Sequence, residues 1–215
     1  MKHIQLDCSH FPLKVVERLA TSLPASLKRL QLTLGEDGDS QMSCFARLIS
    51  GVSLDHLDVS SSNLREAAAH ALADALSSQR LRVAECLNLK DNPLGTHGVT
   101  AIAQCIGAEC LSSLKSMIFA GVTPRAIQTS HDPPAILVEN SNLHSFFDAI
   151  STAALTNLTT LDISNNNLGM LHNPHFALIA CGHVLSWFDT VWQVRMGLPL
   201  SATQSAMGSC TNYLL

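Results

Sequence analysis

The sequence predicts an α/β solenoid, in which parallel strands form a concave face and helices cover the convex face. Three observations predict this fold class. An eleven-residue pattern of spaced leucines recurs along the chain, most copies are 25 to 30 residues apart, and the segments between them favour helix. One copy cannot bury its own apolar side chains, so neighbouring copies must stack around a shared core.

The clearest copy of the pattern is residues 158–168, Leu-Thr-Thr-Leu-Asp-Ile-Ser-Asn-Asn-Asn-Leu. It fits L-x-x-L-x-L-x-x-N-x-L, the pattern of leucine-rich repeats, at every fixed position. The alternation of a strand directs Leu161 and Ile163 toward a core and the residues beside them outward. Asn166 falls in the turn after the strand, where its side chain can hydrogen-bond otherwise unpaired backbone groups.

Six weaker copies precede this one. Copy 84–94 keeps the asparagine, as Asn92, and copy 54–64 has Ser62 in its place. The same inward position of the seven copies is occupied by Ile4, Leu30, Leu57, Leu87, Met117, Ile136 and Leu161. The copies are therefore 26, 27, 30, 30, 19 and 25 residues apart. Steps in the upper twenties leave room for a full helix between successive strands.

The intervening segments support this interpretation, because their apolar residues recur at helical spacing. Helices are predicted within residues 15–23, 65–77, 99–106 and 146–154. Pro24 stops the first of them. The 19-residue step contains Pro133-Pro134 and is too short for a strand, a turn and a helix, so we expect one irregular repeat around residues 120–135.

The character of the chain changes after residue 168. Residues 1–168 form the predicted array of about seven repeats, and residues 169–215 form an atypical C-terminal cap or a partly disordered tail. The apolar run at 176–188 is too short to cross a bilayer, which takes about 20 residues. A second interpretation is that the tail is an altered or truncated end, and that the chain is a fragment of a longer array.

Composition narrows the functional classes. Hydrophobic residues make up 47% of the chain and charged residues 14%, and the net charge of −4 is spread without a basic stripe, which argues against nucleic-acid binding. The seven cysteines are an odd number with no C-x-x-C pair, which favours reduced thiols and a cytoplasmic protein. His3 and Asp7 interrupt any apolar region of a signal peptide.

No motif predicts an enzyme, a cofactor or a metal site. His172 and His175 flank Pro174, which breaks the helix that a pair of ligands would need, and no third ligand is near. The segment 35–38, Gly-Glu-Asp-Gly, lacks the lysine of a phosphate-binding loop and is expected to be an ordinary turn. A nucleophile elbow of the G-x-S-x-G kind is also missing from the sequence.

The repeats over about residues 3–168 resemble the ribonuclease-inhibitor-like class of leucine-rich repeats, which implies a curved solenoid. Within that class, segments 48–59 and 79–89 resemble the repeat domain of the CARMIL type of actin-capping-protein regulator. That resemblance implies a role in regulating actin filament capping at the cell cortex. Members of the family carry a membrane-binding domain and a capping-protein-binding segment outside their repeats. This sequence shows neither, so the resemblance assigns uncapping activity to no residue here.

The outward positions of the strands are the predicted partner-binding surface. Adjacent strands lie about 4.8 Å apart, so these side chains should form a ladder across the concave face. Such a broad surface suits a protein partner better than a small-molecule substrate. The predicted contact residues are His56, Asp58, Ser60, Asn88, Lys90, Asp91, Glu139, Asn140, Thr160, Asp162 and Asn165. The alternative is that each is an ordinary solvated polar residue.

Three functional classes fit a repeat array of this kind. The leading hypothesis is a non-enzymatic protein-interaction scaffold, associated with membranes only indirectly if at all. A GTPase-activating protein of the Ran type is the second, but that class has an acidic tail, which this sequence lacks. A sensor or inhibitor array is the third, although such arrays usually alternate at 28 and 29 residues, which the steps of 19 and 25 do not.

Overall fold

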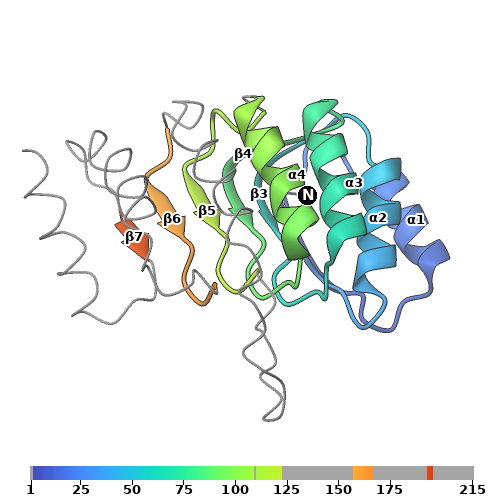
Figure 1. The fold of residues 1–215 in the computed structure, drawn as a ribbon. Helices are drawn as coiled ribbons and strands as arrows, with labels where there is room; N and C mark the ends of the chain where they lie inside the picture. The colour runs from blue at the N-terminus through green and yellow to red at the C-terminus, as the bar shows by residue number, and fades with distance from the viewer. Residues whose placement is uncertain (1, 109, 123–156, 167–192, 196–215) are drawn as a thin grey trace, which may run out of the picture.

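A parallel β-sheet runs the length of the part of the chain that the computed structural model describes, which is residues 2–108, 110–122, 157–166 and 193–195. Its seven strands lie side by side in sequence order (Figure 1). The strands are β1 His3–Asp7, β2 Arg29–Thr33, β3 Val52–Asp58, β4 Leu81–Asn88, β5 Ser116–Ile118, β6 Thr160–Asp162 and β7 Gln193–Arg195. This arrangement confirms the predicted parallel strands and the α/β class.

The register of the sheet follows the leucine pattern. Ile4 pairs with Leu30, Leu30 with Leu57, and Leu57 with Leu87. The row continues through Met117 to residue 161 in β6. Six of the seven predicted inward positions therefore form one line across the sheet, and all of them except Ile4 are buried.

The seventh predicted copy, residues 136–143, lies outside the described residues. Its place in the sequence put its strand between those of the copies at Met117 and Leu161. In the sheet, however, Ser116 of β5 pairs directly with Thr160 of β6. β5 and β6 are therefore neighbours in the sheet, and the copy at 136–143 stays a prediction. The expected irregular repeat around 120–135 lies almost entirely outside the described residues.

Within the described residues, four helices cover one face of the sheet, side by side (Figure 1). They are α1 Leu13–Ser22, α2 Gly38–Leu48, α3 Glu66–Ser77 and α4 Gly95–Gly107. Three confirm the helices predicted within 15–23, 65–77 and 99–106, and α2 fills the interval for which only the spacing predicted a helix. The helix predicted at 146–154 lies outside the described residues. α1 ends before Leu23, which is extended because the following Pro24 disfavours helical backbone there.

The core lies between the sheet and the helices. The inward leucines of the strands meet apolar faces of α2, α3 and α4, where Phe45, Leu72 and Ile102 are almost completely buried. Alanines on α3 are also buried, which lets the helices lie close to one another. Burial of this continuous apolar layer is the main stabilising contribution in a fold of stacked units.

Buried amide side chains join each turn to the turn before it. The Asn92 carbonyl oxygen accepts hydrogen bonds from the N–H groups of Ser62 (2.9 Å) and Leu64 (3.0 Å). Its amide nitrogen donates to the carbonyls of Val59 and Leu89, both at 2.9 Å. Asn166 makes the same pattern of bonds between β6 and the turn after β5. The prediction that asparagine satisfies the turn is confirmed, and the bonds also reach the preceding copy.

Two other residues replace asparagine in this role. The Ser62 hydroxyl accepts from the N–H of Leu34 at 3.0 Å, so it joins the third turn to the second. The turn after β2 has no asparagine at all. There, Gln41 reaches back from α2 and donates to the carbonyls of Cys8 (3.3 Å) and Phe11 (2.8 Å).

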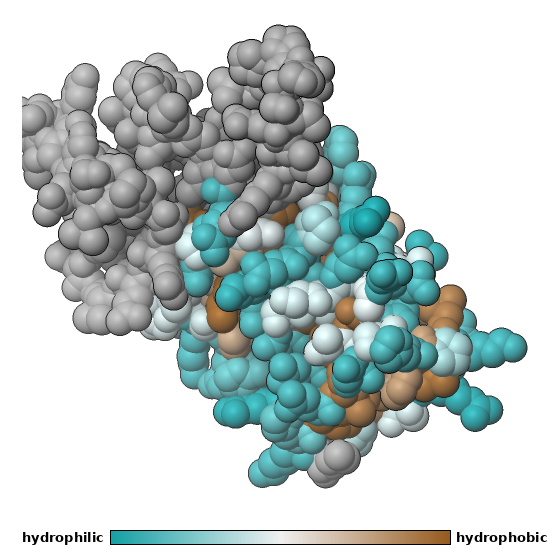
Figure 2. Space-filling view, turned by 90° about the horizontal axis from the view of Figure 1, so that it is seen from below, coloured by the Kyte–Doolittle hydropathy of each residue, from teal (hydrophilic) through white to brown (hydrophobic). Residues whose placement is uncertain are grey.

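The N-terminal end of the array leaves apolar surface exposed. Phe11, Leu13 and Val15 have exposed fractions of 39%, 42% and 42%. Figure 2 shows hydrophobic surface gathered at the end of the molecule farthest from the large grey region. Because α1 has a helix neighbour only on its α2 side among the described residues, its other side is open.

The cysteines of the described residues are free thiols. The cysteines at 8, 44, 86, 105 and 110 form no disulfide. Cys105 is deeply buried, and this burial raises the pKa of its thiol to about 12. Among the described residues, no helix is both long and apolar enough to cross a membrane. Most of the predicted tail lies outside the described residues, except β7, which pairs with β6.

Candidate partner-binding face

The candidate site is the face of the sheet that is turned away from the helices, which we call the outer sheet face. Strand pairing places two rows of side chains on it. The first row is His3, Arg29, His56, Cys86, Ser116 and Thr160. The second row is Gln5, Gln31, Asp58, Asn88, Ile118 and Asp162. Five of the predicted contact residues are therefore on this face.

The structure brings some of these five together and separates others. Asp58 and Asn88 are direct neighbours on β3 and β4. Thr160 and Asp162 lie two strands away on β6, because β5 intervenes with Ile118 in the same row. The predicted polar ladder is therefore interrupted at β5 by an apolar side chain. The sequence contained this information, since Ile118 occupies the outward position between two inward residues of a weak copy.

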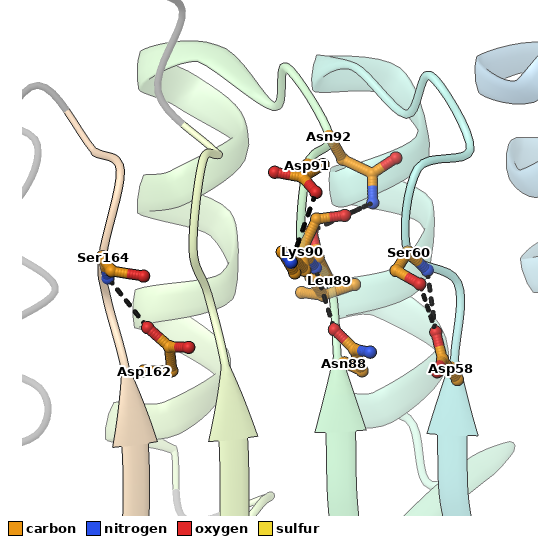
Figure 3. Close-up of polar contacts among 9 residues, drawn as sticks. All are labelled: Asp58, Ser60, Asn88, Leu89, Lys90, Asp91, Asn92, Asp162 and Ser164. Carbon is orange, nitrogen blue, oxygen red and sulfur yellow. Dashed lines mark hydrogen bonds and ion pairs between the residues drawn. The ribbon is translucent and has the colours of Figure 1, made fainter. Parts of the chain in front are cut away.

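Three side chains of the second row, those of Asp58, Asn88 and Asp162, also hold the turns (Figure 3). One carboxylate oxygen of Asp58 accepts hydrogen bonds from the N–H (3.0 Å) and hydroxyl (2.7 Å) of Ser60. Asp162 accepts in the same way from the N–H of Ser164 at 3.0 Å, and Asn88 from the backbone two residues on. Side-chain bonds of this kind are typical of Asp and Asn in turns. A charge reversal at Asp58 or Asp162 would therefore remove a structural bond together with the charge.

The other predicted residues lie beyond the strands. Lys90 and Asp91 are exposed in the turn after β4, with 3.7 Å between the lysine nitrogen and a carboxylate oxygen. Asp91 and Asn165 have positive φ angles of 55° and 58°, which Asp and Asn tolerate better than most residues. Asp91 and Asn165 therefore also have a structural role, because they adopt the backbone conformation that the turn requires. Ser60 bonds to Asp58 as described above, and the predicted contacts at 139 and 140 lie outside the described residues.

A row of charged residues that crosses four neighbouring strands was missed by the sequence analysis. It consists of Lys28, Asp55, Glu85 and Lys115, which we call the charged row. Lys28 and Asp55 form an ion pair at 3.3 Å. Glu85 contacts both Lys115, at 2.6 Å, and His56, at 3.3 Å. The row thus crosses the sheet from the residue before β2, through the middles of β3 and β4, to the residue before β5.

The backbone explains why the charged row is regular. The carbonyl of Lys28 accepts hydrogen bonds from the N–H groups of both Asp55 (2.7 Å) and His56 (3.0 Å). The carbonyl of Lys115 likewise accepts from two successive N–H groups at the start of β6, those of residues 159 and 160. Each charged residue stands two positions before the inward residue of its copy. The same period that revealed the leucines could therefore have revealed this row.

Electrostatics in the charged row are those of an exposed surface. The hydrogen bond and positive charge of Lys115 lower the pKa of Glu85, and Glu85 raises the pKa of Lys115. Exposed pairs of this kind contribute little to stability, because water and salt screen them. Their side chains can therefore take part in recognition at small cost to the fold.

The described residues offer no cluster of three or more His, Cys, Asp or Glu side chains that could hold a metal ion. The predicted weak pair at 172 and 175 lies outside them. What the outer sheet face presents is a broad arrangement of polar and charged side chains of both signs. The chemistry it can perform is recognition through hydrogen bonds and ion pairs.

Comparison with known families agrees with the repeat pattern. Residues 157–178 match the family model for the Leucine Rich Repeat. This match and the parallel sheet fit a leucine-rich-repeat protein. The matched region includes the clearest copy, 158–168. The weaker copies lie outside it and are recognised by the same spacing of inward residues. No curated protein matches the chain.

Proposed function

We propose that the chain is a non-enzymatic protein-binding module, which receives its partner on the outer sheet face over β3, β4 and β5. The observation that carries the proposal is the charged row. Its side chains lie in a line across neighbouring strands, carry both signs and are partly exposed. A surface with mixed charges is suited to a protein partner, since charge complementarity gives protein interfaces their specificity. Leucine-rich repeats commonly serve protein interaction, and the family match supports the same role.

The proposal includes the shape of the whole array. Stacked strand–helix units whose helices are wider than their strands curve away from the helices. We therefore infer a horseshoe of the ribonuclease-inhibitor-like class, with the outer sheet face on its concave side. None of the narrower roles considered from the sequence, in actin filament capping, GTPase activation or sensing, is favoured by a particular described residue, so the proposal stays at partner binding.

Glu85 and Lys115 allow a sharp test, because they pair with each other and are exposed. We expect Glu85→Lys to remove the partner that the wild-type chain captures from cytosol. We expect the charge-swapped variant, Glu85→Lys with Lys115→Glu, to lose it as well, although the swap restores an internal ion pair. The measurement is quantitative mass spectrometry of the captured proteins, with circular dichroism to establish that each variant is folded.

Asp74→Lys is the matched control, because it makes the same change of charge on exposed α3, in the helix layer. The control should capture the same proteins as the wild type. If the single and swapped variants also do so, the outer sheet face is not the binding surface and the proposal fails. If the swap alone restores capture, the loss came from the broken pair and direct recognition of these charges is excluded.

A further inference from the structure

The free edge of β1 has features that the proposed partner-binding face does not use. β1 is the first strand of the sheet and pairs with β2 on one side. On the other side, no described strand pairs with it. Unpaired edge strands readily accept another strand, and proteins usually protect them with charge, proline or a covering element. β1 has none of these on its inward positions, Ile4 and Leu6.

The hydrogen-bonding groups of this edge can be assigned from the pairing with β2. The carbonyl of Lys2 accepts from the N–H of Arg29 at 2.9 Å, and the N–H of Cys8 donates to the carbonyl of Thr33 at 2.7 Å. Backbone groups alternate in direction along a strand. The even-numbered residues of β1 therefore bond to β2. The N–H and carbonyl groups of His3, Gln5 and Asp7 point to the free edge.

We propose that two copies of this chain associate by antiparallel pairing of their β1 strands, centred on Gln5, to form one continuous sheet. This register pairs every outward N–H and carbonyl of β1, because Gln5 faces Gln5 of the second copy and His3 faces its Asp7. The side chains that this register brings together are also complementary. Ile4 lies opposite Leu6 on the helix side, and the imidazole lies opposite a carboxylate on the outer sheet face.

The electrostatics of Asp7 support this pairing. The hydroxyl and N–H of Ser9 both donate to the Asp7 carboxylate, at 2.6 Å and 3.0 Å. These bonds lower the pKa of Asp7, so the group is negatively charged at neutral pH. A two-fold axis through the centre of the paired strands would place two such carboxylates opposite two histidines.

The apolar surface of α1 supports the same interface. Glu17 faces α2, where its carboxylate contacts Cys44. Val15 and Leu19 are each two positions from Glu17, about 200° around a helix with 3.6 residues per turn, so they lie on the opposite side. That side is the one next to the free edge of β1. A two-fold axis perpendicular to the sheet keeps the helices of both copies on the same face. The exposed Val15 of one copy would then meet Val15 of the other, beside Leu19, which is partly buried against the core.

The test is the mass of the whole chain in solution, measured by sedimentation equilibrium over a range of concentrations. We expect the wild type to dimerise. Gln5→Pro should abolish the dimer, because it removes an outward N–H and leaves the even-numbered bonds to β2 in place. His3→Asp should raise the dimer dissociation constant by roughly tenfold. Each copy would then place a carboxylate at position 3 opposite the Asp7 carboxylate of the other copy, so the dimer would contain two repulsive pairs.

His97→Asp makes the same substitution on exposed α4, away from β1, and should dimerise as the wild type does. Asp7→Asn keeps the acceptor for Ser9, as Asn88 does for Lys90, and should weaken the dimer through loss of charge alone. A monomeric wild type at all concentrations would overturn the proposal. So would a dimer that Gln5→Pro leaves intact, since its interface would then lie elsewhere.

Discussion

At the scale of single residues, the fold depends on polar side chains that satisfy buried backbone. Asn92 is completely buried, yet its amide group bonds to backbone groups of two successive turns. Ser62 and Gln41 do the same with different side chains and from different positions. A buried backbone N–H or carbonyl group that lacks a hydrogen-bond partner lowers the stability of the fold. The few side chains that pair with such groups therefore contribute strongly to stability.

Asn92→Ala tests this role. The substitution leaves the N–H groups of Ser62 and Leu64 and two carbonyls without their partner, so we expect the free energy of unfolding to fall by about 3 kcal/mol. Urea denaturation followed by circular dichroism measures this value. Asn157→Ala is the matched control, because Asn157 is exposed and makes one bond to the carbonyl of Ser112, so it should cost less than about 1 kcal/mol. Equal effects of the two substitutions would contradict the role of the buried amides.

At the scale of elements, helix positions were easier to predict than the way helices are anchored. Repeated alanine and leucine predicted α3, and the bounds differ from the expected segment by one residue at its start. Nothing in the pattern predicted that Gln41 of α2 would replace the missing asparagine of its turn. That contact depends on how closely α2 approaches its neighbours, which is a property of tertiary packing and not of periodicity.

Gly38 lets the start of α2 lie close to the turn after β3. A Cβ atom built at Gly38 would lie only 1.8 Å from the carbonyl oxygen of Ser62, so any side chain there must displace the start of α2 or the next turn. We expect Gly38→Ala to lower the free energy of unfolding by about 1–3 kcal/mol. Ser40→Ala, at an exposed position of the same helix, should change it by less than about 0.5 kcal/mol. Thermal unfolding of both variants measures the difference, and a stable Gly38→Ala variant would mean that the two segments are farther apart.

At the scale of the whole molecule, periodicity predicted the strand order best where the copies are regular. The copies at Leu30, Leu57 and Leu87 are regular, so their strands could only stack in sequence. Between Met117 and Leu161 the pattern suggested another strand, but a pattern of inward residues does not state which strands become neighbours. That choice depends on competition among all possible pairings, which a local pattern does not contain.

The candidate site shows the same limit. The alternation of strands correctly placed His56, Asp58 and Asn88 on the outer sheet face. It could not show that Asp58 also holds a turn, or that Glu85 links His56 to Lys115. The contacts of Glu85 join residues about 30 positions apart in sequence, so they follow from the register of the whole sheet. The bond of Asp58 is local, since its partner Ser60 is two residues on, but the alternation of a strand does not state how the following turn is closed.

The central claim, that the outer sheet face receives a protein partner, is tested most directly by photo-crosslinking from defined positions. A photoreactive residue at Ser116 would lie on that face beside the charged row, and one at His70 would lie exposed on α3. After irradiation in cytosol, we predict a crosslinked partner from position 116 and none from position 70. A partner crosslinked from position 70 and not from position 116 would place binding on the helices and contradict the claim.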